Sequence, residues 1–245
     1  MTAADALIDD LCNLEPIKTW SLIVTLFGDL SDHHITGKEL GLLMGHVGIK
    51  TEAIRVALHR LRKDGWIVST KSGREVTYSL SDVGLAETRA AYEDVYRRDV
   101  KYPQGWKLLL TKSDYAAPDP AIRIERSLLL VPVEAVLLDG AALGLQADTD
   151  HIPDWFSDRI VPSQTLVLAQ KLCEIAERPG IGDLSPLSLA AVRLLLLHYW
   201  RKIALRNSSW AHISMIPQGP LAQCHHRVTQ VMADLPRLDP AAFAN

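Results

Sequence analysis

The segment TEAIRVALHRLRKDG, residues 51–65, constrains this chain more than any other segment, because two helical lines of residues run along it. Four apolar residues share the i, i+3, i+4, i+7 spacing of a buried helical stripe: Ile54, Ala57, Leu58 and Leu61. Three basic residues follow a neighbouring line at i, i+4 and i+7: Arg55, His59 and Arg62. A helix that reads the DNA major groove must be fixed to the protein by one side and expose basic residues on another. These two lines of residues meet both requirements.

The residues before this segment predict two more helices. Pro16 suits the first turn of a helix that ends near Gly28. Thr36 and Glu39 have the spacing of a capping box, which predicts the start of the next helix. After a glycine-containing turn, we expect Thr51 to cap the basic helix.

The residues after the basic helix predict a β-hairpin. Trp66–Thr70 and Val76–Leu80 have strand patterns, and Lys71–Arg74 supplies the turn. From residue 50 to residue 78 the chain has seven Lys or Arg against three Asp or Glu, although its whole formal charge is −3. Concentrated positive charge is expected of a nucleic-acid interface.

The order of helices and hairpin predicts a winged helix-turn-helix that binds double-stranded DNA. The alternative for a single basic amphipathic helix is an ordinary solvated face, but the ordered combination of elements is more specific. The predicted DNA contacts are Lys50, Thr51, Arg55, His59, Arg62, Lys71 and Arg74.

The rest of the chain gives weaker patterns, and we predict a mainly helical α+β protein with three domains. A winged helix-turn-helix with an exit helix would occupy residues 1–98, a small α/β domain 99–160 and a helical domain 161–245. Residues 92–105 resemble a linker, 106–111 and 134–140 strands, and 122–130 a helix; residues 163–178 and 185–205 have helical patterns.

Composition and short motifs narrow the function. The three widely spaced cysteines predict no disulfide framework, and the absence of a secretory or membrane-spanning pattern predicts a cytoplasmic protein. No catalytic motif is present, so we predict that the chain is not an enzyme. We predict no cofactor or metal. Cys224–His226 has no second ligand pair at useful spacing. His33–His34, with Asp29 and Asp32, stands in a turn between helices, where polar residues are expected.

One further cluster near a helix end has two interpretations. The cluster contains His198, Tyr199, Arg201, Lys202 and Arg206. Trp155 could line one side of a binding site formed by these residues. The basic residues could simply complement a helix dipole. Alternatively, they could hold the anionic groups of an effector while the aromatic residues stack on a ring.

The segments SLIVTLFGDL, GIKTEAIRVALHRLRKDGWI and SGREVTYSLSDVG resemble the phenylacetic acid degradation repressor (PaaX-like) family. LLLLHYWRKIALR is a weaker match near the C-terminus, and the chain departs from the family pattern after Arg206. The resemblance implies a homodimeric repressor with a ferredoxin-like middle domain and a helical C-terminal domain. It further implies repression of an operon for aromatic catabolism, relieved by an acyl-CoA or aryl-CoA thioester.

Two other functions stay open. A ferredoxin-like middle domain resembles the fold of small CRISPR-associated nucleases, so a metal-dependent nuclease is the alternative, with Asp114 as its candidate carboxylate. A scaffold that uses the winged helix for protein contacts is the third possibility.

Overall fold

The computed structural model describes residues 3–112, 115–118, 121–136, 142–147, 153–206 and 208–244. The chain is a mixed α+β protein and mostly helical. It divides into two compact units, each built from separated segments. The first contains residues 1–97, 171–202 and 226–245, and the second contains residues 98–170 and 203–225. The division into three domains stays a prediction.

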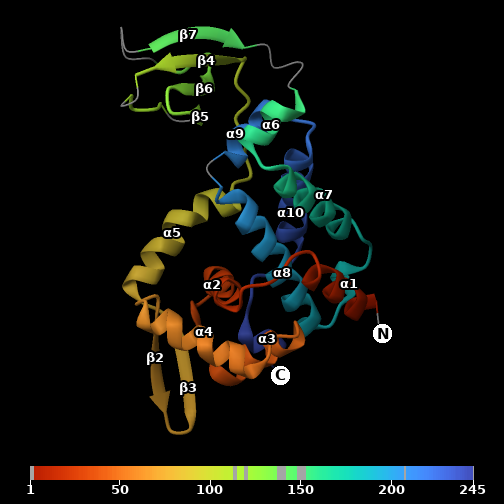
Figure 1. Ribbon diagram of the computed structural model, residues 1–245. Helices are drawn as coiled ribbons and strands as arrows, with labels where there is room; N and C mark the ends of the chain where they lie inside the picture. Colours follow the sequence, from red (N-terminus) through yellow and green to blue (C-terminus); the bar gives the residue numbers. More distant parts are fainter. Residues whose placement is uncertain are drawn as a thin grey trace. The chain divides into compact units, whose positions relative to one another are not determined.

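The first unit begins with helices and a small sheet (Figure 1). In chain order these elements are α1 (Ala3–Cys12), α2 (Thr19–Asp29), β1 (His34–Thr36), α3 (Gly37–His46), α4 (Thr51–Lys63), β2 (Ile67–Ser72), β3 (Glu75–Leu80) and α5 (Asp82–Tyr96). The three strands form an antiparallel sheet in the order β1-β3-β2. The hairpin predicted by the sequence is confirmed, with strands slightly longer than expected.

Helix starts follow the predicted chemistry at one position and depart from it at two. At α3, Thr36 accepts from the Glu39 amide at 3.2 Å and Glu39 accepts from the Thr36 amide at 2.8 Å, so the capping box is confirmed. The cap predicted at Thr51 is wrong: Thr51 is the first helical residue, and the N-cap Lys50 makes no side-chain cap. Pro16 also lies outside α2. This helix begins at Thr19, because the Lys18 carbonyl accepts hydrogen bonds from the backbone amides of Ser21 and Leu22 in its first turn.

Later parts of the chain complete the first unit. They comprise the second half of α7 (Ser163–Ala176), the 3-10 helix η1 (Ile181–Asp183), most of α8 (Pro186–Ala204), the end of α10 (Pro220–Asp234) and α11 (Pro240–Phe243). The predicted helical patterns over residues 163–178 and 185–205 are therefore confirmed. Helix α8 is almost wholly apolar along its middle and is buried from Ala190 to Trp200.

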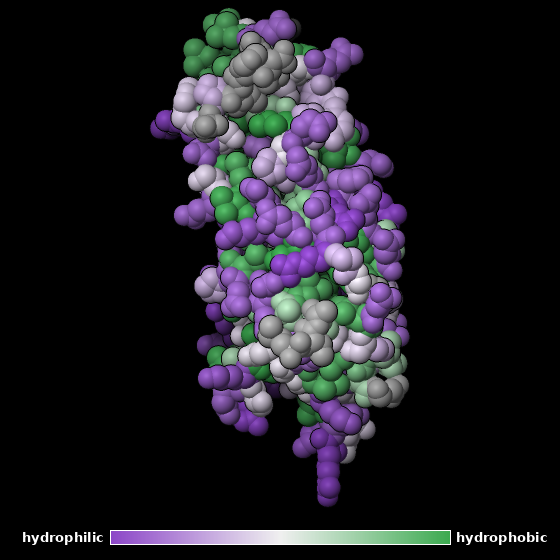
Figure 2. Space-filling view, turned by 90° about the vertical axis from the view of Figure 1, so that its right-hand side faces the viewer, coloured by the Kyte–Doolittle hydropathy of each residue, from purple (hydrophilic) through white to green (hydrophobic). Residues whose placement is uncertain are grey.

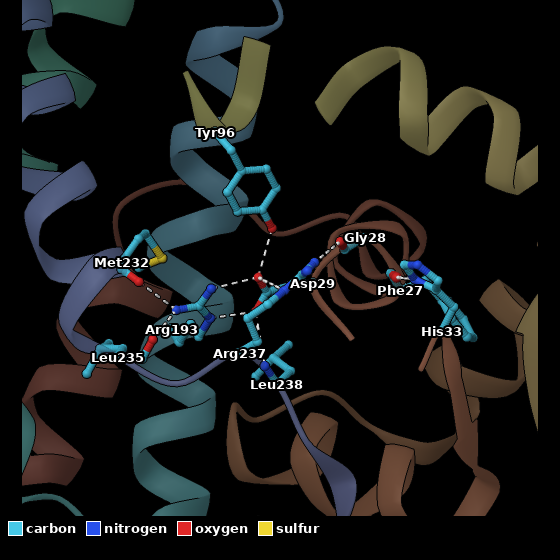
Figure 3. Close-up of polar contacts among 10 residues, drawn as sticks. All are labelled: Phe27, Gly28, Asp29, His33, Tyr96, Arg193, Met232, Leu235, Arg237 and Leu238. Carbon is cyan, nitrogen blue, oxygen red and sulfur yellow. Dashed lines mark hydrogen bonds and ion pairs between the residues drawn. The ribbon is translucent and has the colours of Figure 1, made fainter. Parts of the chain in front are cut away.

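A buried polar cluster closes this core where α2 ends (Figure 3). The Asp29 carboxylate is fully buried and accepts two hydrogen bonds from Arg193 of α8, at 2.5 and 2.8 Å. Tyr96, the last residue of α5, donates its hydroxyl to Asp29 at 2.8 Å, and the Leu238 amide donates at 3.2 Å. Arg237 adds an ion pair at 3.8 Å. These contacts join α2, α5, α8 and the C-terminal segment.

The second unit contains a four-stranded antiparallel sheet in the order β5-β6-β4-β7. Its strands are β4 (Trp106–Thr111), β5 (Ile122–Glu125), β6 (Leu128–Pro132) and β7 (Ala142–Ala147). Leu109, Leu129 and Val131 lie on one face and form a small core with Tyr115.

Three predictions for this region need correction. The predicted helix over residues 122–130 is instead β5, a two-residue turn and the start of β6. The β-branched and leucine residues there pair across the sheet rather than forming a helical stripe. The strand predicted over 134–140 is not found in its described part, residues 134–136, and its remainder lies outside the described residues. The predicted linker is helical up to Tyr96.

The second unit also contains α6 (Asp154–Ile160), the first half of α7, α9 (Ser209–Met215) and the first part of α10. His212 of α9 is buried and its Nε2 lies 3.2 Å from the Ser157 hydroxyl of α6. Burial lowers the pKa of His212 to about 4, so its imidazole is neutral at pH 7. Within the described part of the chain, no helix is both long and apolar enough to cross a membrane.

Candidate nucleic-acid interface

Helix α4 is fixed to the first unit by one apolar side. Ile54, Ala57, Leu58 and Leu61 are all buried, as the sequence predicted. The helix ends at Lys63, and two residues later Gly65 has a positive φ of 75°, which a residue with a side chain adopts only with strain. The Trp66 amide then donates to the Leu61 carbonyl and turns the chain into β2. The buried side therefore determines which residues face solvent.

All seven residues predicted to contact DNA are exposed, and all lie in the first unit: Lys50, Thr51, Arg55, His59, Arg62, Lys71 and Arg74. Lys50 and Thr51 are at the start of α4, and the next three residues are on its exposed side. Lys71 and Arg74 flank the tip of the β2–β3 hairpin. We call this set the cationic face.

The cationic face forms only weak contacts with its own chain. Arg55 makes an ion pair with Glu52 at 2.9 Å, but both side chains are at least 70 % exposed. Arg62 donates to the Ser69 hydroxyl of β2 at 3.5 Å, the outer limit of a hydrogen bond. Exposed contacts of this kind contribute roughly 0–1 kcal/mol, so a ligand can replace them at small cost.

The hairpin extends from the unit as a free arm (Figure 1). Its turn is made by Gly73, whose φ is 62°, and Arg74. In Figure 2 the lower end, where Figure 1 has this hairpin, is a narrow hydrophilic projection. The tip therefore carries its basic side chains into solvent, where a second surface could meet them.

The base of the hairpin is held firmly in place. Ser81, the N-cap of α5, donates to the carbonyl oxygens of Gly65 and Trp66 and accepts from the Gly84 amide. A side chain at Gly84 would collide with the Trp66 carbonyl, so the first turn of α5 packs directly on the turn that joins α4 to β2. This arrangement fixes the hairpin relative to α4.

Two exposed residues on the same side of α4 were missed by the sequence analysis. Lys63 is exposed and lies one helical turn beyond His59. Val56, which is 68 % exposed, lies one turn before His59 and one turn after Glu52. Helical periodicity would have found Lys63. Arg60, by contrast, turns away: its guanidinium lies 5.5 Å from the centre of the Trp20 ring and 3.5 Å from the Asp64 carboxylate.

The residues of the predicted effector cluster are divided between the two units. Trp155 and Arg206 belong to the second unit and are exposed. Lys202 makes an ion pair with Glu15, and Tyr199 donates its hydroxyl to the Glu15 carbonyl at 3.1 Å. Burial raises the pKa of Tyr199 to about 12.

His198 and Arg201 lie one helical turn apart on α8. His198 is buried with Nδ1 3.3 Å from the Thr25 hydroxyl. Because Thr25 donates its own proton to the Ser21 carbonyl at 3.0 Å, His198 must be the donor in this contact. Burial, followed by the charges of Arg201 and Lys202, lowers the pKa of His198 to about 4.

The histidine pairs noted in the sequence have structural contacts. His33 has a positive φ of 55°, with Nδ1 3.1 Å from the Phe27 carbonyl, and the His225 ring lies 5.1 Å from that of Trp210. Among the residues that the structure describes, no group of His, Cys, Asp and Glu could hold a metal ion. Asp114, the candidate nuclease carboxylate, lies outside them.

Comparison with known proteins agrees with this geometry. Residues 18–84, from the start of α2 to the start of α5, match the family model described as PaaX-like protein. The chain is also 25 % identical to a protein named transcriptional repressor PaaX from Escherichia coli (strain K12). That alignment spans 283 residues and covers 100 % of this chain and 88 % of the relative. Residues 18–84 are therefore similar to the PaaX-like family, and the whole chain is distantly similar to a transcriptional repressor.

Proposed function

We propose that this protein is a DNA-binding transcriptional repressor whose α2–β3 region is a winged helix-turn-helix. One observation carries the proposal: seven exposed residues of α4 and the hairpin form the cationic face, while the opposite side of α4 is buried. Helices α3 and α4 would be the helix-turn-helix, and the β2–β3 hairpin would be the wing.

In this proposal, α4 enters the major groove with Arg55, His59 and Arg62 facing bases and phosphates. Lys50 and Thr51 lie at the positive end of the helix, which favours a phosphate there. Lys71 and Arg74 contact the DNA backbone from the wing. The firm base of the hairpin supports this assignment, because both sets of contacts need a fixed separation.

The family supports a wider proposal. The protein would act as a cytoplasmic homodimer on the operator of a catabolic operon, for aromatic compounds by resemblance. Repression would be relieved by an acyl-CoA or aryl-CoA thioester. The ferredoxin-like middle domain is also a proposal: its strand order and antiparallel pairing fit that fold, but the described parts of the β4–β5 and β6–β7 connections contain no helix.

The proposal can be tested with a duplex that the wild-type protein selects from a random-sequence pool. We expect the double variant Arg55→Ala/Arg62→Ala to bind this duplex at least about 100-fold more weakly by fluorescence anisotropy, since specific contacts to bases contribute roughly 1–3 kcal/mol each. Its circular dichroism and melting temperature should stay close to those of the wild type.

A matched control removes the same charge elsewhere. Arg126 and Lys171 are exposed and lie outside α4 and the hairpin, so Arg126→Ala/Lys171→Ala should bind DNA nearly as the wild type does. Equal affinity of the two double variants would overturn the proposal. So would the failure of the wild-type protein to enrich any sequence from the pool.

A further inference from the structure

A pocket in the first unit contains a cation, Arg201, that has no partner among the residues that the structure describes. It lies among α2, α5 and α8, and Arg201 of α8 lines it. Within the described ranges, no hydrogen bond or ion pair reaches the Arg201 guanidinium, although the residue is only partly exposed. Its neighbour Lys202, in contrast, is paired with Glu15. Removing a guanidinium from water costs free energy unless its N–H groups find hydrogen-bond acceptors or an opposite charge.

The walls of the pocket are mostly apolar and aromatic. Val24 and Thr25 come from α2, Tyr92 and Tyr96 from α5, and Trp66 from the start of the hairpin. The two tyrosine rings stack with their centres 4.5 Å apart. The cavity itself is small, about 30 Å³, and it is partly open to solvent.

The charges around the pocket leave one cation available to a ligand. His198, one turn before Arg201, donates to Thr25 and is neutral at pH 7 because its pKa is lowered to about 4. Glu87 of α5 lines the mouth and is exposed. Arg193 and Arg237 are committed to Asp29. Among the described lining residues, Arg201 is therefore the group that an anion would meet.

We propose that this pocket binds a small organic acid, with its carboxylate on Arg201 and its apolar body against Trp66, Val24 and the tyrosine rings. A guanidinium presents two parallel N–H donors that match a carboxylate, and apolar walls suit a hydrocarbon or aryl group. So small a cavity can take the carboxylate and the adjoining part of a small acid, and cannot enclose a complete CoA thioester.

The position of the pocket suggests a consequence that rests on the proposed function. Trp66 follows the last turn of α4, and Ser81 ties its carbonyl to the start of α5. A ligand between Trp66 and α5 would act on the element that holds α4 and the hairpin at their separation. The bound acid should therefore alter affinity for DNA.

The binding claim is tested without DNA, by isothermal titration calorimetry with benzoate and hexanoate. Their neutral amides, benzamide and hexanamide, are matched controls for the apolar body. We expect at least one acid to bind and its amide to bind about tenfold more weakly or worse, because the charge-assisted bonds are lost. If neither acid binds, or if acid and amide bind equally, the proposal is wrong.

Variants assign the site. Arg201→Gln and Arg201→Leu should each weaken binding of the acid by about tenfold or more, whereas Lys202→Met should leave it unchanged. Circular dichroism will show whether each Arg201 variant is folded. If one of the two variants does not fold, the other still tests the site. Unchanged binding in a folded Arg201 variant would overturn the proposal. Acid binding by Arg55→Ala/Arg62→Ala should be normal, so this result and the DNA result are independent.

Discussion

Two groups of charged residues in the first unit differ in almost every physical respect. The cationic face is exposed and makes only weak contacts with its own chain. The Asp29 cluster is buried, and its two main charges are 0 % and 3 % exposed and joined by two hydrogen bonds (Figure 3). The first group is available to a partner molecule, whereas the second is fully used by the fold.

The location of a charge therefore decides whether it serves binding or stability. Removing an exposed cation costs the fold little, because water replaces its contacts. Removing one member of a buried pair leaves the other charge without solvent or partner, which is far more costly. Tyr96 shows how strong the buried field is: burial and the Asp29 carboxylate raise the pKa of its hydroxyl well above the ordinary value.

The largest effect is expected from Asp29→Ala. This variant leaves the Arg193 guanidinium buried without its carboxylate, and breaking such a pair costs about 3–5 kcal/mol. Urea denaturation should show a midpoint strongly reduced from that of the wild type. The double variant Asp29→Leu/Arg193→Met should recover part of the loss; a single variant as stable as the wild type would contradict this account of the cluster.

A smaller effect is expected from pH, and it arises from a buried histidine, His198. The folded pKa of His198, about 4, lies below the unfolded value of about 6.5, so the unfolded state binds more protons between these values. Stability should therefore fall as pH decreases from about 6.5 towards 4, by about 2 kcal/mol at pH 5 from His198.

The pH prediction is checked by urea denaturation at pH 7.5 and pH 5. His198→Gln should reduce the difference in free energy of unfolding between the two values, because glutamine does not titrate. Identical pH profiles for wild type and His198→Gln would contradict the prediction.

A still smaller loss is expected from Tyr96→Phe. Removing the hydroxyl eliminates one hydrogen bond to Asp29 and keeps the aromatic ring, so the free energy of unfolding should fall by about 1–2 kcal/mol. Tyr92→Phe, at a ring that is 45 % exposed, is the control and should change stability by less than about 0.5 kcal/mol. Equal effects of the two changes would show that the Asp29 contact is unimportant.

The smallest effect on stability is expected within the cationic face. Lys71→Ala/Arg74→Ala should change the free energy of unfolding by less than about 0.5 kcal/mol, since both side chains are exposed. The DNA affinity of this variant should nevertheless depend less on salt concentration. The slope of log K against log salt concentration should be smaller in magnitude by roughly 2, because each lost phosphate contact removes about 0.9. An unchanged slope would remove the wing from the interface.

The sequence predicted the cationic face well because its signals are local. The buried line of α4, the capping box at Thr36 and the two-strand hairpin all depend on residues close together in the chain. The prediction that Thr51 caps α4 was wrong because Lys50 occupies the N-cap position. The Lys50 side chain makes no capping hydrogen bond, so the local sequence does not indicate this position.

The buried cluster and the pocket could not be predicted in the same way. Asp29 looked like a polar residue in a turn, and only the fold brings Arg193, 164 residues later, to its carboxylate. The β5–β6 hairpin was also missed, because short apolar runs suit a helix or a strand until pairing partners are known. Long-range pairing, rather than local pattern, decides these regions.

The central claim, that the cationic face meets DNA, is tested most directly by amide hydrogen exchange with and without the selected duplex. On binding, amide exchange should slow in α4 and in the β2–β3 hairpin, and the same peptides should stay unprotected in Arg55→Ala/Arg62→Ala. Protection by DNA that is absent from both α4 and the hairpin, and is found in other parts of the chain, would contradict it.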